Sequence, residues 1–190
     1  MKASKISPFG EGDNRQLNAC VGSNGGPYNF ADYAYGYLAL GNSVAEQIIK
    51  NDGHWEDVPI DVGIYPLLYL YRQGMELMLK HFIYDREGVT RINGSHDLEK
   101  LWIESKQVLT ELLVSYSNLD ESLQKIEQFI KKLSELDPNG EVMRFPEDLQ
   151  RKTFLSDYSI INIEPIYESA KEMKILLDAM RSAINGISDV

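Results

Sequence analysis

The feature that most constrains the fold of this chain is an apolar repeat near the end of the sequence, in residues 164–187. Apolar residues recur there at alternating spacings of four and three, which places their side chains on one side of an α-helix. The repeat consists of Ile166, Ala170, Met173, Leu177, Met180 and Ile184. A helix with one apolar side packs that side against other helices, so the repeat predicts a helix that belongs to a bundle.

Four earlier segments also have apolar residues at helical spacing and are predicted to be helices. Gly53 should end the first, because glycine adopts the left-handed C-terminal conformation at little cost. Pro66 should lie in the first turn of the second, where its missing N–H is not needed. These helices are predicted over residues 30–50, within residues 62–84, after Ser95, and from near Asn118 to the Asp-Pro-Asn-Gly turn at residues 137–140.

These five segments predict an all-α fold, a helical bundle of about five helices. Residues 1–27 are rich in Gly, Asn, Ser and Pro, and they are predicted to be a loop-rich N-terminal arm. Residues 141–160 are predicted to be irregular, with a short extended pair. The expected organisation is therefore an arm over residues 1–27 and a single helical domain over residues 28–190, which is long enough to form one hydrophobic core.

The helix predicted within residues 62–84 is apolar on most sides. With about 100° of turn per residue, its long polar side chains Arg72, Gln73, Glu76 and Lys80 fall within an arc of about 100°. One interpretation is a solvated stripe held by ion pairs four residues apart, each worth about 0.2–0.5 kcal/mol. The other is a polar groove in which the two cations hold a phosphate and Glu76 orients Arg72. In both interpretations the other sides are buried, which makes this the central helix of the bundle.

The chain is acidic, with 29 Asp and Glu against 19 Lys and Arg and a formal net charge of -10. Nonspecific nucleic-acid binding needs a basic surface, so this balance argues against it unless a local basic patch exists. The candidate for such a patch is MRFPEDLQRK, residues 143–152. Arg144 and Arg151 are the residues there that would contact a phosphate, with Phe145 stacking on a base. The alternative is a loop that caps one end of the bundle with its aromatic ring.

Neither a metal site nor a cofactor is predicted. The single cysteine, Cys20, allows no intramolecular disulfide and no cysteine-based zinc site, which fits a reducing cytoplasm. His54 stands beside Glu56 and Asp57, but a metal site needs three or four converging ligands. His81 is predicted to be a core or interface histidine. The N-terminus lacks the apolar run of a signal peptide and no stretch is apolar enough for a membrane span, so a cytoplasmic protein is expected.

Two segments in the middle of the chain form a pattern. RQGMELMLKHF, residues 72–82, contains Arg72–Gln73, Glu76–Leu77 and Leu79–Lys80, and SHDLEKL, residues 95–101, contains His96–Asp97–Leu98 with Leu101. A helix reading roughly RQ..E..LK, followed by a loop and HDL..L, resembles the HEPN superfamily. The chain looks like a diverged member, and the resemblance covers about residues 62–102.

The HEPN resemblance implies a compact helical bundle that often forms homodimers. Members of that superfamily include ribonuclease toxins, partners of small nucleotidyltransferases, RNA-cleaving modules of defence systems and noncatalytic versions. A homodimer is therefore expected, with a nucleotidyltransferase or another defence-system protein as a candidate partner and RNA or a nucleotide as a candidate ligand. The candidate residues of a ligand-binding or polar groove are Arg72, Gln73, Glu76, Lys80, His96 and Asp97. Because only a short loop joins the two helices, Arg72, Glu76 and His96 are predicted to lie near one another.

Ribonucleases of the HEPN superfamily usually have an arginine and, a few residues later, a histidine near the start of a late helix. Arg91 and His96, in the stretch RINGSH, have such a spacing. However, Asn93–Gly94–Ser95 is typical of a turn followed by a helix N-cap, which puts Arg91 in a loop and His96 in the first turn of a helix. The positive end of the helix dipole disfavours the imidazolium form that a general acid needs. No catalytic residues are therefore expected.

The leading hypothesis for function is a noncatalytic HEPN-like protein that binds a nucleotide, RNA or a protein partner in a prokaryotic defence or toxin–antitoxin setting. One alternative is a metal-independent HEPN ribonuclease that uses Arg91 and His96. Another is a pure dimerisation or interaction module. Chelator-resistant cleavage of RNA would separate the ribonuclease from the other two.

Overall fold

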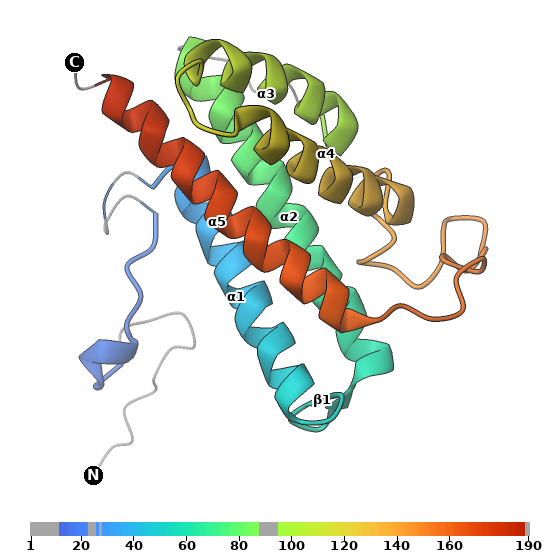
Figure 1. The fold of residues 1–190 in the computed structure, drawn as a ribbon. Coiled ribbons are helices and arrows are strands. Elements are labelled where there is room, and N and C mark those ends of the chain that lie inside the picture. Colours follow the sequence, from blue (N-terminus) through green and yellow to red (C-terminus); the bar gives the residue numbers. More distant parts are fainter. Residues whose placement is uncertain (1–11, 23–25, 27, 88–94, 189–190) are drawn as a thin grey trace.

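A computed structural model of the chain describes residues 12–22, 26, 28–87 and 95–188. Within these residues it has five α-helices, one 3-10 helix and one small antiparallel sheet (Figure 1), so the prediction of an all-α bundle of about five helices is confirmed. In chain order the elements are η1 (Arg15–Leu17), α1 (Phe30–Lys50), β1 (His54–Trp55), β2 (Val58–Pro59), α2 (Ile60–Glu87), α3 (Leu98–Leu112), α4 (Leu119–Leu136) and α5 (Ile163–Ser188).

Helix α2 is the central element, as its sequence predicts. It is in contact with α1, α3 and α5, while α4 packs against α3 and α5 (Figure 1). Most of the largest fully buried side chains belong to α2: Leu67, Leu68, Tyr71, Met75, Met78, Leu79 and Phe82. The hydrophobic core therefore surrounds α2, with α1 and α5 covering one side of it and the α3–α4 pair covering another.

Two glycines bring α1 and α2 close together. A Cβ atom on Gly41 of α1 would lie 2.8 Å from Cε1 of Tyr71, and one on Gly74 of α2 would lie 2.7 Å from Cγ of Leu38. Both distances are shorter than van der Waals contact, so only glycine permits this spacing of the two helices. The crossing then buries Tyr71, whose hydroxyl donates a hydrogen bond to Oδ1 of Asn42 at 3.1 Å.

The apolar repeat of α5 packs against the core as predicted. Ala170, Met173, Leu177 and Met180 are buried, and Ile166 and Ile184 at the two ends are partly buried. This pattern confirms that the alternating spacing of four and three marks the side of α5 that faces the bundle.

The predicted end of α1 is confirmed, with one addition. Gly53 has a positive φ of 91° and its N–H donates to the carbonyl of Ile48 at 2.9 Å, which closes the helix. Asp52, one residue earlier, also adopts a left-handed conformation, with φ 50°. In this turn, therefore, a residue other than glycine also adopts the left-handed conformation.

The position predicted for Pro66 is wrong. Strand β2 leads directly into α2 at Ile60, so the helix begins earlier than its apolar spacing indicates and Pro66 lies inside it, beyond the first turn. Pro66 is exposed, so its ring faces solvent, and the helix continues through it.

Outside the helices, the described part of the chain is mostly irregular. The predicted short extended pair in residues 141–160 is confirmed as one bridge between Glu147 and Thr153. In the described part of the N-terminal arm, η1 is the one regular element. None of the described helices has both the length and the apolar content needed to cross a lipid bilayer.

Candidate functional site

The polar residues of α2 meet the start of α3 and the end of α4 in the interior of the bundle. Arg72, Glu76 and Lys80 are 3%, 2% and 6% exposed. The interpretation of a solvated stripe is therefore wrong, because α3 and the turn after α4 cover this side of α2. Together with His96 and Asp137 these three residues form what we call the charge cluster.

Glu76 lies at the centre of the charge cluster. Its Oε1 accepts hydrogen bonds from Nζ of Lys80 at 2.7 Å and from the Nδ1–H of His96 at 2.9 Å. Its Oε2 accepts from Nη1 of Arg72 at 3.1 Å. The predicted convergence of Arg72, Glu76 and His96 is confirmed by these contacts. A carboxylate only accepts hydrogen bonds, so Nδ1 of His96 is the donor and Nε2 is left on the outer side of the ring.

Arg72 connects three elements that are far apart in the sequence. Its Nη2 donates to the carbonyl of His96 at 2.6 Å, just before α3. Its Nε donates to the carbonyl of Asp137 at 3.1 Å and lies 3.5 Å from Oδ2 of the same residue, at the end of α4. A guanidinium at the C-terminus of a helix satisfies a free carbonyl and interacts favourably with the helix dipole. Arg72 thus holds the end of α4 and the start of α3 against α2.

Asp137 belongs to the charge cluster but was not predicted as a site residue. It is 1% exposed, and its Oδ1 accepts a hydrogen bond from the N–H of Val142 at 3.1 Å, which fixes the turn after α4. Gly140 in that turn has φ 78°, and a Cβ atom there would lie 2.9 Å from Nη1 of Arg72. The available signal was a charge imbalance, since two cations and one anion on a buried arc require a second anion from elsewhere in the chain.

The charges in the cluster compensate one another. Arg72 and Lys80 are matched by Glu76 and Asp137. Burial raises the pKa of Glu76, but the hydrogen bond and charge of Lys80 and the hydrogen bond from His96 outweigh this effect and hold the pKa below its usual value. The cluster is therefore a closed ionic network, in which both buried cations already have anionic partners.

The chain was compared with protein-family models, with curated proteins and with solved structures. No match was found in any of the three.

The start of α3 differs from the prediction. The helix begins at Leu98, and its N-cap is Asp97, whose Oδ1 accepts from the N–H of Lys100 at 3.1 Å. His96 therefore lies before the cap and outside the first turn, and the dipole argument applied to it was wrong. Ser95 accepts a hydrogen bond from the N–H of Asp97 at 3.3 Å, and this local turn delays the helix start by two residues.

The remaining predicted groove residues have different surroundings. Asp97 is exposed and acts as a helix cap, and Gln73 is half-buried on the same side of α2 as the cluster. Arg91 lies outside the described residues, so the expectation that it is not catalytic and the alternative that pairs it with His96 both stay predictions. Among the residues that the structure describes, no three His, Cys, Asp or Glu side chains are grouped to hold a metal ion.

Arg144 and Arg151, the candidate phosphate contacts, have different partners. Nε of Arg144 donates to the carbonyl of Gly140 and its guanidinium lies over the ring of Phe145. Arg151 is exposed and pairs with Glu147 at 2.6 Å. Phosphate contact by these residues stays a prediction, and the contacts shown serve the loop itself.

Proposed function

We propose that this chain is a noncatalytic, HEPN-like helical protein that acts by binding other proteins, in a prokaryotic defence or toxin–antitoxin setting. The proposal rests on the closed charge cluster: the polar residues that the sequence shares with the HEPN pattern bind one another and connect three helices. The setting rests on the resemblance in the sequence.

Among the three ligand classes expected from the sequence, a protein partner has more support than a nucleotide or RNA. A phosphate site needs cations that solvent can reach. Arg72 and Lys80 are buried and already bound to Glu76, and the chain has a formal net charge of -10. Both features oppose a polyanionic ligand.

One side of α1 supports protein binding. Tyr33, Gly36, Tyr37 and Leu40, at helical spacing, line a groove of about 740 Å³ that residues 20–22 of the N-terminal arm also line. Tyr33 and Leu40 are more than half exposed. We call these four residues the α1 face. Asp32 and Arg181 form an ion pair of 3.0 Å at its edge, so the α1 face has the apolar centre and polar rim of a protein interface.

A second copy of this chain is the proposed occupant of the α1 face. In a two-fold symmetric dimer the same surface packs against itself, and apolar side chains on one helix then meet identical ones on the other. Nothing lies within 4 Å of a Cβ placed on Gly36, so a second helix can approach the backbone closely there. The homodimer implied by the HEPN resemblance would use this surface.

The test is light scattering on the purified chain at micromolar concentration. We expect twice the mass of 21.6 kDa, and we expect Leu40→Glu to give the monomer because it places two carboxylates across the two-fold axis. The matched control is Leu149→Glu, since Leu149 is 99% exposed and does not line the groove. A parent protein found only at 21.6 kDa, or a Leu40→Glu variant that remains dimeric, would contradict the proposal.

The proposed further partner is a nucleotidyltransferase or another defence-system protein, as the resemblance implies. Co-elution of such a protein with the purified homodimer would support this part of the proposal. A homodimer that elutes without any other protein would instead indicate a pure dimerisation module.

A metal-independent ribonuclease is the second candidate function, and one observation favours it. The His96 side chain is 67% exposed, and its Nδ1–H is held by a buried carboxylate. That arrangement fixes the ring and leaves Nε2 on its outer side, where a general base would contact a substrate.

The two candidates differ in their reaction with RNA. The purified parent, His96→Ala and Arg91→Ala would each be incubated with structured and single-stranded RNA, with and without a chelator. We expect no cleavage by any of the three. Chelator-resistant cleavage that both substitutions abolish, with an unchanged circular dichroism spectrum, would establish the ribonuclease.

A further inference from the structure

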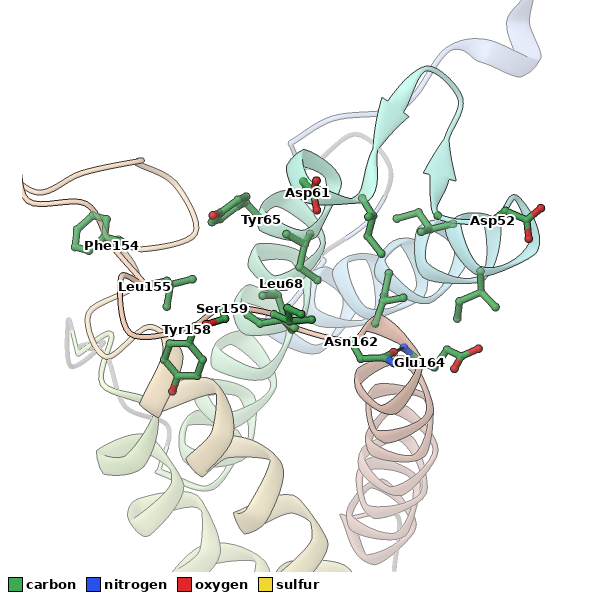
Figure 2. A pocket seen from close by; sticks show the side chains of 18 residues that line it. Asp52, Asp61, Tyr65, Leu68, Phe154, Leu155, Tyr158, Ser159, Asn162 and Glu164 are labelled. Atoms are coloured by element: carbon green, nitrogen blue, oxygen red, sulfur yellow. Dashed lines mark hydrogen bonds between the residues drawn. The ribbon is translucent and has the colours of Figure 1, made fainter.

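We propose that a pocket at the hairpin end of the bundle binds a small amphipathic organic cation, a molecule with an apolar body and an amine or guanidine at one end. The pocket lies between the end of α1, the start of α2, the segment that begins at Phe154, and the start of α5 (Figure 2). It is separate from the charge cluster and from the α1 face, so it goes beyond the proposed function and does not depend on it.

The size and the floor of the pocket suit an apolar body. The cavity measures about 630 Å³, which lies within the range of about 300–1,000 Å³ of small-molecule sites. Its floor is formed by buried aliphatic side chains from three helices. These are Ile48 of α1, Ile64 and Leu68 of α2, and Ile163 of α5.

The charged residues of the pocket are all acidic. Asp52, Asp61 and Glu164 line it, and none of the eighteen described residues around it is a Lys, Arg or His. The three carboxylates make no hydrogen bond or ion pair with any residue that the structure describes, whereas Glu46 on α1 is paired with Lys50. Within the described part of the chain, the pocket therefore has three negative charges without a partner, and a cation complements them.

Two of these carboxylates have a local role, and the third does not. Asp61 and Glu164 lie in the first turns of α2 and α5, where a helix dipole of about half a positive charge favours them. Asp52 lies just beyond the C-terminus of α1, where the dipole is negative and a cation is the favoured group. It also has a left-handed backbone. A carboxylate at such a place is stabilised by a bound cation.

Aromatic rings in the pocket wall add to the attraction for a cation. Tyr65 projects from α2, and Phe154 and Tyr158 lie on the segment opposite (Figure 2). The two tyrosines are 41% and 46% exposed. The electron-rich face of an aromatic ring attracts ammonium and guanidinium groups. Tyr65 lies beside Asp61 on α2 (Figure 2), so this carboxylate and ring together favour an organic amine over a metal ion.

The test compares three probes that share an indole body and differ in charge: tryptamine, the neutral tryptophol and the anionic indole-3-acetate. Each would be titrated into the full chain at neutral pH while amide chemical shifts are recorded. We expect tryptamine to bind more tightly than the other two and to shift the amides of Gly53, Asn162 and their neighbours. We also expect its binding to weaken as salt is added.

Three isosteric substitutions test the charges: Asp52→Asn, Asp61→Asn and Glu164→Gln. Each should weaken tryptamine binding by about twofold to fivefold, and the triple variant by about tenfold or more. Glu168→Gln is the matched control, because Glu168 is exposed on α5 and does not line the pocket. The control should bind tryptamine as the parent does.

Three results would overturn the proposal. They are equal or tighter binding of tryptophol or indole-3-acetate, shifts that fall outside the pocket residues, and a triple variant whose affinity is unchanged. None of these results bears on dimer formation, so the failure of this proposal is distinguishable from failure of the proposed function.

Discussion

Glu76 holds two buried cations and one histidine with its two oxygens, so the charge cluster depends most directly on this side chain. The same spacing of four residues also occurs at the surface, where Glu46 pairs with Lys50 at 2.7 Å. The Glu76–Lys80 and Glu46–Lys50 ion pairs are both 2.7 Å long, and they differ in burial. They therefore allow the effect of burial to be measured within one protein.

We expect Glu76→Ala to lower the free energy of unfolding by about 3–5 kcal/mol, because it leaves Arg72 and Lys80 buried without their carboxylate. Urea denaturation followed by circular dichroism measures the loss. Glu46→Ala is the control and should leave the denaturation midpoint unchanged, since Lys50 stays solvated. Equal effects of the two substitutions would show that the cluster is open to water.

The lowered pKa of Glu76 predicts a dependence of stability on pH. The folded-state pKa lies below the ordinary value of 4.5, so the ionised carboxylate stabilises the fold fully above pH 4.5. This contribution is lost as the pH falls through the folded-state pKa. The unfolding free energies of the parent and Glu76→Gln should therefore differ most near neutral pH and converge in acid. A difference that stays constant down to the acid transition would contradict this assignment.

At the scale of single elements, capping residues decide where the helices begin. Oδ1 of Asn29 accepts from the N–H groups of Ala31 and Asp32, and Asp32 accepts from the N–H of Asn29 in return. This bond from Asn29, together with the charge of Arg181, keeps the pKa of Asp32 low despite burial. Asn118, before α4, has φ 59° and no side-chain capping bond. The two asparagines occupy the same position relative to their helices and stabilise them differently.

We expect Asn29→Ala to destabilise the chain by about 1 kcal/mol, because it removes a capping box. Asn118→Gly should change the stability by less than about 0.5 kcal/mol, because no capping bond is lost and glycine accepts the left-handed conformation. Chemical denaturation of both variants measures the difference. A larger loss for Asn118→Gly than for Asn29→Ala would show that the capping box adds nothing.

The same local chemistry sets the limit of prediction from the sequence. The bounds predicted for residues 30–50 are those of α1, and in the structure one capping box and one glycine enclose this apolar spacing. Ser95 and Asp97 are both good capping residues two positions apart, and the apolar spacing does not choose between them. The choice depends on Ser95 binding the N–H of Asp97, and this placed His96 outside the helix. The start of α2 was missed for a similar reason, since the preceding hairpin fixes it.

At the scale of the whole molecule, the bundle and its central helix could be predicted and the composition of the charge cluster could not. Helical spacing is a local property, and the short connection from α2 to α3 brought Arg72, Glu76 and His96 together in the prediction. Asp137 is 65 residues from Arg72 along the chain. It opens the Asp-Pro-Asn-Gly turn, where an aspartate is common without any distant contact. Only the packing of α4 against α3 places it in the cluster.

The connection through Arg72 predicts linked local stability. Arg72→Lys keeps the charge but loses the planar fork of donors that reaches the carbonyls of both His96 and Asp137. We expect amide hydrogen exchange to become faster at the start of α3 and in the turn after α4 together. Exchange in the first half of α1 should stay as in the parent. Faster exchange at only one of the two places would show that Arg72 does not couple them.

The closed charge cluster also restricts how this sequence can diverge. Replacement of one charged member leaves another charge buried without a partner. Replacement of all members together by apolar residues of similar volume is often neutral or stabilising. Descendants of this chain should therefore keep Arg72, Glu76, Lys80 and Asp137 together or lose them together, with few surviving intermediates. A descendant that has replaced all four would keep the bundle and lose the RQ..E..LK pattern of residues 72–80.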